Sequence, residues 1–202
     1  MRRGIFGGSF DPIHFGHLLP VERARRELGL ERVDYLPTAR PPHKADRRFA
    51  PALARYAMVE LALLEREGLY ASDLELDASR PTYTIDTLER LRTLAPGDDL
   101  QLIIGADSFA DLPTWVRWRE ILVAARLAVL TRPGFRREEL LAAAPPELVA
   151  AAAAGRVAWI DNPPLELSST ELRRRLAAGE PIPAGWVPER VLTYVAKYRL
   201  YR

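Results

Sequence analysis

Apolar residues along the chain fall into two arrangements, which are short continuous runs and longer segments with helical spacing. Short apolar runs bounded by glycine, proline or polar residues are typical of buried strands, whereas apolar positions three or four residues apart indicate amphipathic helices. Strands are predicted in this way at 4–6, 32–37, 100–105, 127–131 and 157–160, and one further strand is predicted within 69–76. Helices are predicted at 16–28, 50–67 and 84–94, in two segments within 138–155, from 168 onward, and at the C-terminus. The alternation predicts an α/β fold with a doubly wound, mainly parallel sheet and right-handed crossovers.

The apolar stripes of two predicted helices indicate which face of each helix is buried. In 50–67 the stripe consists of Leu53, Ala57, Leu61 and Leu64, and we expect it to cover the sheet. In 84–94 the stripe consists of Ile85, Leu88, Leu91 and Leu94, with Thr84 as the expected N-cap. The 50–67 helix is predicted to be structural, whereas the residues at the start of the 84–94 helix are read either as capping residues alone or as part of a ligand site.

Composition narrows the class of protein. The chain has 202 residues, of which 48% are apolar and 28% charged, and it contains no cysteine. We predict a single domain over 1–202, with 165–202 as its helical C-terminal part, because this length can bury one core. The absence of cysteine excludes disulfides and fits a reducing compartment. Because residue 1 leads straight into a strand and no apolar run approaches 18 residues, we expect a cytoplasmic protein without a signal peptide or membrane span.

The charge balance is nearly neutral. The chain carries 29 basic and 27 acidic residues, which gives a net charge of +2. The basic residues are scattered over several segments, so the pattern predicts no nucleic-acid partner and is satisfied by small anionic substrates. Oligomeric state is left open, with a homo-oligomer among the alternatives.

Residues 4–18 predict a phosphate site. An apolar strand ends in Gly7-Gly8, where the backbone can turn tightly with its amides exposed, and a helix begins near Gly16. The positive end of that helix and its free amides then face the same place as the glycines. His14 and His17 lie beside it as further hydrogen-bond donors. The alternative, in which the two histidines bind a transition metal, is disfavoured because no cysteine and no third histidine is near in sequence.

A second helix start brings further donors. Ser168 and Glu171 have the spacing of a capping box, so a helix is expected to begin there on local grounds alone. The segment follows a strand, and the amides of Ser169 and Thr170 are therefore predicted to face the same sheet edge as the histidines. Arg173, one turn into the helix, is placed to contact phosphate oxygens.

Other polar residues follow the predicted strands. Asp107 comes after the 100–105 strand and is a candidate to accept hydrogen bonds from a ribose, to cap a short helix beginning at Ser108, or to do both. His43 and Lys44, in a proline-stiffened loop, are candidates for phosphate contact. Trp115 is a candidate for stacking on an aromatic ring, with burial in the core as the alternative.

These motifs carry a family resemblance over essentially the whole chain. Gly7-Gly8-Ser9-Phe10-Asp11-Pro12 with His14-Phe15-Gly16-His17 resembles the signature of the nucleotidyltransferases that share a His-x-Gly-His motif. Pro41-Pro42-His43-Lys44, Tyr83-Thr84-Ile85-Asp86-Thr87 and Ser168-Ser169-Thr170 with Arg173 narrow the resemblance to the bacterial nicotinate-nucleotide adenylyltransferases. Val116 departs from the aromatic residue that relatives often carry, which weakens any assignment of a pyridine contact there.

The resemblance implies a Rossmann-like fold and transfer of AMP from ATP to nicotinate mononucleotide, with Mg²⁺ bound to ATP, pyrophosphate as the leaving group and no covalent intermediate. It implies catalytic roles for His14, His17, Lys44 and Arg173. It implies ATP contacts from Gly7, Gly8, Ser9, Phe10, Gly16, Gly105, Asp107, Arg132, Ser168, Ser169 and Thr170. It implies nicotinate mononucleotide contacts from Ser9, His43, Lys44, Tyr83, Thr84 and Trp115.

Three alternatives stay open at the level of sequence. Pantetheine-phosphate and FMN adenylyltransferases share the first loop, a nucleotide sensor would bind ATP without turnover, and a metal hydrolase would use His14 and His17. A P-loop kinase or ATPase is disfavoured because the chain has no Gly-x-x-x-x-Gly-Lys-Ser/Thr sequence.

Overall fold

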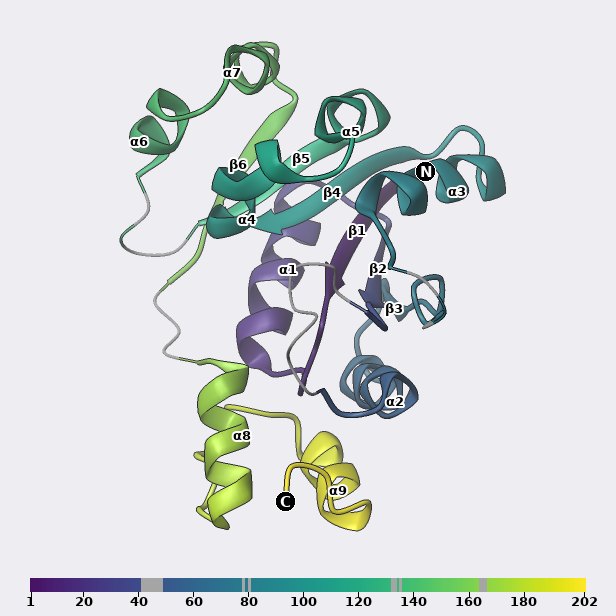
Figure 1. Cartoon of the computed structure of the whole chain (residues 1–202), viewed down its shortest axis with the longest axis vertical. Coiled ribbons are helices and arrows are strands. Elements are labelled where there is room, and N and C mark those ends of the chain that lie inside the picture. Colours follow the sequence, from purple (N-terminus) through teal and green to yellow (C-terminus); the bar gives the residue numbers. More distant parts are fainter. Residues whose placement is uncertain (41–48, 78, 80, 132–133, 135, 164–166) are drawn as a thin grey trace. The chain divides into compact units, whose positions relative to one another are not determined.

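Six strands form one sheet with the order β3-β2-β1-β4-β5-β6. The structure is a computed structural model that describes residues 1–202 except 41–48, 78, 80, 132–133, 135 and 164–166. The strands are β1 Arg2–Gly8, β2 Arg32–Pro37, β3 Leu69–Ala71, β4 Asp99–Gly105, β5 Arg126–Thr131 and β6 Val157–Asp161. β1 pairs with β4, β4 with β5, and β5 with β6, all in parallel. The prediction of a doubly wound α/β fold is confirmed (Figure 1).

Most of the described helices lie close to predicted ranges, but α5 was not predicted. They are α1 Phe15–Glu27, α2 Ala52–Leu63, α3 Thr84–Leu94, α4 Ala106–Asp111, α5 Trp118–Ala124, α6 Arg137–Ala142, α7 Pro146–Ala153, α8 Ser169–Ala178 and α9 Glu189–Lys197, with a 3₁₀ turn at Leu112–Thr114. Gly29 follows α1 with a φ of 59°, as a C-terminal stop requires. In the ranges that the structure describes, no helix is both long and apolar enough to cross a membrane.

The chain divides into two compact units. Unit 1 comprises 1–6, 20–34 and 82–164, and unit 2 comprises 7–19, 35–81 and 165–202. Unit 1 holds β4, β5 and β6, and its helices α3 and α7 each contact α5. Unit 2 holds β3, α2, α8 and α9, with α2 in contact with both β3 and α9 (Figure 1). The prediction that 1–202 is a single domain stays a prediction.

Packing explains the identity of several unit 1 residues. A Cβ added at Gly4 in β1 would come within 3.0 Å of Leu30, Val33 and Ile103, so only glycine fits between these side chains. The middle strands are apolar on both sides, with Leu102, Ile103, Leu127, Ala128 and Val129 all buried, as expected for a parallel sheet. Ionic contacts of Asp34 with Arg3 and Arg32 satisfy its fully buried carboxylate.

The buried face of α2 differs from the prediction. Leu53 and Leu64 are 72% and 65% exposed, whereas the buried residues are Arg55, Met58, Val59, Ala62 and Leu63. Both sets have helical spacing, and the helix is apolar around most of its circumference, so periodicity alone could not choose between them. The deciding residue is Arg55, whose guanidinium is fully buried because backbone carbonyls surround it.

Smaller differences occur at helix starts. Tyr83, not Thr84, occupies the N-cap position of α3, and Leu94 at its other end is exposed. α4 begins at Ala106 with Gly105 as N-cap, so Asp107 lies inside the first turn and does not cap the helix. Neither helix has a side-chain cap. The predicted starts relied on Thr84 and Asp107 as capping residues, and they are therefore wrong by one or two residues.

Candidate functional site

The loop between β1 and α1 turns at residues 10–12, not at the two glycines. Gly7 and Gly8 are the last residues of β1, and Phe10 takes the left-handed conformation, with a φ of 44°. The Asp11–Pro12 peptide bond is cis. A Cβ added at Gly8 would lie 3.0 Å from the Phe10 ring, so glycine is needed there for close packing. We call residues 9–14 the signature loop.

The two predicted histidines lie together at the start of α1. Their ring centroids are 3.8 Å apart at an interplanar angle of 30°, and the His17 ring also meets the edge of Phe10. A Cβ added at Gly16 would lie 2.8 Å from the His14 ring, so the glycine of the His-x-Gly-His motif makes room for that ring. The two histidines of the motif are thus in contact with each other, and the glycine between them is required because a side chain there would collide with His14.

The amides of this helix start are less available than the sequence suggested. The Phe15 amide donates to the Trp186 carbonyl at 2.9 Å, and the His17 amide donates to the His14 carbonyl at 2.8 Å. The expectation of several free amides pointing at an anion is therefore wrong for these two. Side-chain nitrogens and the helix dipole are left as the main attractions for a phosphate at this end of α1.

His14 is 4% exposed, and its Nδ1 atom is buried without a hydrogen-bond partner among the described residues. Burial disfavours the charged imidazolium and lowers the pKa of His14 from 6.5 to about 4. At neutral pH this side chain is therefore an uncharged imidazole. It can donate one hydrogen bond and accept one, which suits a group that orients a phosphate oxygen without carrying a full charge.

Stability is predicted to fall below neutral pH because of His14. The unfolded chain binds a proton near pH 6.5 and the folded chain only near pH 4, so His14 contributes its full stability above pH 6.5 and loses it as the pH falls toward 4. We expect a loss of about 2 kcal/mol at pH 5 from this residue. Urea unfolding at pH 7 and pH 5 measures it, with His14→Asn as the control whose stability lacks this term. Equal pH dependence in both proteins would contradict the assignment.

Helix α8 brings its own start against the signature loop. The Ser169 hydroxyl donates to the Pro12 carbonyl at 3.2 Å, and Arg173 Nη1 donates to the Asp11 carbonyl at 2.6 Å. Arg173 Nη2 also donates to the Thr170 hydroxyl at 3.2 Å. The predicted meeting of the Ser168–Arg173 segment with the histidine loop is thus seen within unit 2, and its side chains are what joins them.

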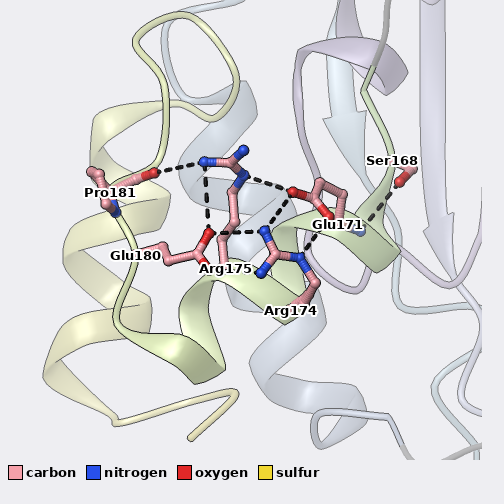
Figure 2. A network of polar contacts seen from close by, with 6 residues as sticks. All are labelled: Ser168, Glu171, Arg174, Arg175, Glu180 and Pro181. Atoms are coloured by element: carbon pink, nitrogen blue, oxygen red, sulfur yellow. Dashed lines mark hydrogen bonds and ion pairs between the residues drawn. The ribbon is translucent and has the colours of Figure 1, made fainter.

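The start of α8 is fixed by a cap and by an ionic network, which Figure 2 shows. The Ser168 hydroxyl accepts from the Glu171 amide at 3.2 Å, as the capping box predicts. The Glu171 carboxylate does not return to Ser168 but accepts from Arg174 and Arg175, and Arg174 also binds Glu180. Hydrogen bonds from Arg174 and Arg175 lower the pKa of Glu171 to about 2, so it stays ionised in any ordinary buffer.

A buried polar centre lies behind the signature loop, and sequence reasoning missed it. Asp11 is 1% exposed, and its Oδ1 accepts from the Tyr201 hydroxyl at 2.8 Å and from the Ala50 amide at 3.1 Å. Arg55 donates to the carbonyls of Ser9, Thr38, Ala39 and Ala50 at 2.7 to 3.3 Å. The one sequence feature that could have indicated this centre is Arg55 among apolar residues of α2. It was overlooked because the predicted buried stripe of α2 was the one with Leu53, Leu61 and Leu64.

The remaining predicted residues belong to other parts of the chain. Gly105 ends β4 with open space beside its Cα, and Asp107 is exposed in the first turn of α4. Tyr83 caps α3 next to Thr84, and Trp115 is half-buried after the 3₁₀ turn. All of these lie in unit 1. His43, Lys44 and Arg132 lie outside the described residues.

Among the residues that the structure describes, no three His, Asp or Glu side chains gather in a way that could hold a metal ion. Asp11, the carboxylate of the signature loop, is committed to Tyr201, Ala50 and the neighbourhood of Arg173. The described site therefore offers donors and one neutral imidazole, which fits a phosphate-bearing ligand.

Known proteins are similar to this chain in sequence. A family model described as cytidylyltransferase-like matches residues 5–175. Probable nicotinate-nucleotide adenylyltransferases from Thermus thermophilus and Solibacter usitatus are 44% and 43% identical over 202 residues, with full coverage of both chains. One from Desulfitobacterium hafniense is 39% identical and covers 100% of this chain and 96% of its own.

Solved structures agree at the level of the fold. Plasmodium falciparum nicotinic acid mononucleotide adenylyltransferase complexed with NaAD superposes with a TM-score of 0.80 at 21% identity, covering 99% of this chain and 97% of its own. A putative nicotinate-nucleotide adenylyltransferase from Vibrio parahaemolyticus gives 0.67 at 20% identity, covering 100% and 96%. With a family model over most of the chain and full-length relatives above 40% identity, the chain belongs to the nicotinate-nucleotide adenylyltransferase family of cytidylyltransferase-like nucleotidyltransferases.

Proposed function

We propose that this protein transfers AMP from MgATP to nicotinate mononucleotide, giving nicotinate adenine dinucleotide and pyrophosphate. Family membership supports the reaction, and the observation that carries it is the convergence of His14, His17 and Arg173 on one loop of unit 2. A phosphate oxygen of the mononucleotide attacks the α-phosphorus of ATP, the bond to the bridging oxygen breaks, and pyrophosphate leaves with Mg²⁺. No protein nucleophile is required.

Each described residue has a role in this proposal. His17 donates to the α-phosphate, His14 orients the bridging or β-phosphate as a neutral imidazole, and Arg173 receives the departing pyrophosphate. Such a reaction depends on positioning and on neutralising charge that develops on oxygen, which fixed donors at two helix starts supply. The Ser168 cap and the Glu171 network hold Arg173 on a rigid first turn, so its guanidinium loses little freedom on binding.

The other predicted contacts complete the proposal. Gly7, Gly8, Ser9, Phe10, Gly16, Gly105, Asp107, Arg132, Ser168, Ser169 and Thr170 are proposed for ATP. Ser9, His43, Lys44, Tyr83, Thr84 and Trp115 are proposed for the mononucleotide, with Lys44 also as a catalytic cation. The open space beside Gly7 and Gly105 supports close approach of a ligand to each strand end.

Pyrophosphate release tests the reaction. The protein is incubated with MgATP and, separately, nicotinate mononucleotide, FMN and pantetheine phosphate, and pyrophosphate is assayed with the dinucleotide product. We expect release with the pyridine mononucleotide only. Release with another acceptor would reassign the substrate, and binding of ATP without release from any acceptor would favour the nucleotide sensor.

We expect a preference for the acid mononucleotide over the amide. The start of α3, where Tyr83 and Thr84 lie, presents the positive end of a helix dipole, which favours a carboxylate over a neutral carboxamide. Charge-assisted hydrogen bonds add to this, so kcat/KM should be at least about tenfold higher for the acid. Asp86 in the first turn pairs with Arg117 at 3.6 Å, which directs its charge toward that arginine. Equal kcat/KM for the two mononucleotides would contradict this assignment.

A further inference from the structure

The last residues of the chain reach the signature loop. Tyr201 follows α9, and its hydroxyl donates to Asp11 Oδ1 at 2.8 Å across 190 positions of sequence. Tyr201 holds a left-handed backbone, with a φ of 65°, which is unfavourable for a bulky residue by about 1 kcal/mol or more. A strained residue whose side chain is inserted into a buried polar centre indicates that the hydroxyl contact is specific.

Asp11 connects this hydroxyl to the proposed phosphate-binding arginine. One carboxylate oxygen, Oδ1, is shared by Tyr201 and the Ala50 amide, and the other, Oδ2, lies 3.6 Å from Arg173 Nη1. Oδ2 is buried and makes no hydrogen bond with a described residue. The same Arg173 nitrogen donates to the Asp11 backbone carbonyl. The two hydrogen bonds on Oδ1 therefore fix the plane of the carboxylate, and the carboxylate faces Arg173 with one oxygen unsatisfied.

Charged groups surround Asp11, so the orientation of its carboxylate affects the neighbouring arginines. Arg55 is buried nearby, and its charge acts on both Asp11 and Tyr201. Burial, followed by the charge of Asp11, raises the pKa of Tyr201 far above its ordinary value, so the phenol keeps its proton and can donate at neutral pH. If that donor is lost, the buried carboxylate must take its missing hydrogen bond from another donor nearby, even one that already donates elsewhere. Arg173 Nη1 is the described donor on the side of Oδ2.

We propose that Tyr201 is a positioning residue for the adenylyl-transfer reaction: by holding Asp11 Oδ1 it keeps the Asp11 carboxylate from hydrogen-bonding Arg173, so that this guanidinium can turn to the pyrophosphate portion of MgATP. The inference rests on the proposed function for the role of Arg173. Without the hydroxyl, Asp11 rotates toward the guanidinium and withdraws it from the phosphates. The C-terminus of the chain thus belongs to the site through Asp11, although Tyr201 touches no substrate.

Tyr201→Phe tests this proposal, with Tyr198→Phe as the matched control. Tyr198 lies three residues earlier on the same tail, is 55% exposed, and its ring contacts that of Tyr194. Loss of a hydrogen bond to a buried charge predicts about tenfold weaker binding of MgATP and pyrophosphate, measured by calorimetry, for Y201F and none for Y198F. Binding of nicotinate mononucleotide should be unchanged in both. Unchanged pyrophosphate affinity in Y201F overturns the proposal, and so does an equal loss for all three ligands, which would indicate general unfolding.

A double-mutant cycle with Arg173→Ala tests whether Tyr201 acts on MgATP binding through Arg173. If Tyr201 acts through Arg173, then Y201F costs about tenfold in kcat/KM for MgATP in the parent and nearly nothing in the R173A background. A tenfold loss in both backgrounds overturns the route through Arg173. If Y201F does not fold, Asp11→Asn takes its place in the test, because the amide keeps the shape of the side chain and removes its charge. The affinity for pyrophosphate must then change at least threefold. An unchanged affinity overturns the proposal.

The binding measurements separate this inference from the proposed function. If the parent protein shows no pyrophosphate release with any acceptor, the adenylyl-transfer proposal fails while the comparison of MgATP affinities still tests Tyr201. If the parent is active and Y201F matches it in affinity and in kcat/KM, the inference fails and the function stands.

Discussion

Replacing His17 by Ala is expected to lower kcat by about 10² to 10³, the order found when one donor to a developing negative charge is removed. The His17 ring is held between His14 at 3.8 Å and the edge of Phe10 at 5.3 Å, so its position is fixed before substrate binds. A fixed donor acts most strongly where charge accumulates, which is on the α-phosphate in the transition state. The loss should therefore appear in kcat, with a much smaller change in KM.

Steady-state kinetics with MgATP and nicotinate mononucleotide measure this effect, and thermal unfolding confirms that the variant is folded. Leu19→Ala is the matched control, because Leu19 lies on the same helix and is 43% exposed. Its kcat should stay within a factor of about two of the parent, as for surface substitutions. A folded H17A protein with near-normal kcat would show that His17 does not contact the reacting phosphate.

Replacing Arg55 by Met is expected to destabilise the fold by about 3 to 5 kcal/mol, as when one partner of a buried ionic cluster is removed. Arg55 is 1% exposed and donates to four carbonyls, those of Ser9, Thr38, Ala39 and Ala50. Met fills a similar volume but donates nothing, so these carbonyls lose a partner that water does not replace. Asp11 loses a nearby counter-charge at the same time.

Urea unfolding measures the free energy of unfolding for R55M, R55K and the parent. Lys keeps the charge but not the planar fork of donors, so R55K is expected to lie between the other two. Leu53→Met on the exposed face of α2 is the control and should change stability by less than about 0.5 kcal/mol. A loss below about 1 kcal/mol in R55M would mean that the carbonyls find other donors and that the buried centre is not what fixes the signature loop.

The elements of the fold followed from local patterns, because apolar runs and helical spacing reflect burial directly. The strands at 4–6, 32–37, 100–105, 127–131 and 157–160 all appear within a few residues of their predicted ends. The helix start at Ser168 was also readable, since a capping box is a contact between near neighbours in sequence. The convergence of His14 and His17 followed from their three-residue spacing at a helix start.

The buried centre was decided by tertiary structure alone. Asp11, Arg55 and Tyr201 lie far apart in sequence, and no sequence pattern indicates that they meet in one buried centre. Whether an arginine points to solvent or into a ring of carbonyls depends on which backbone segments meet around it, and no local pattern records that. The same reason explains the wrong stripe on α2, where both faces have helical spacing and the face that carries Arg55 is buried against the carbonyls of Ser9, Thr38 and Ala50.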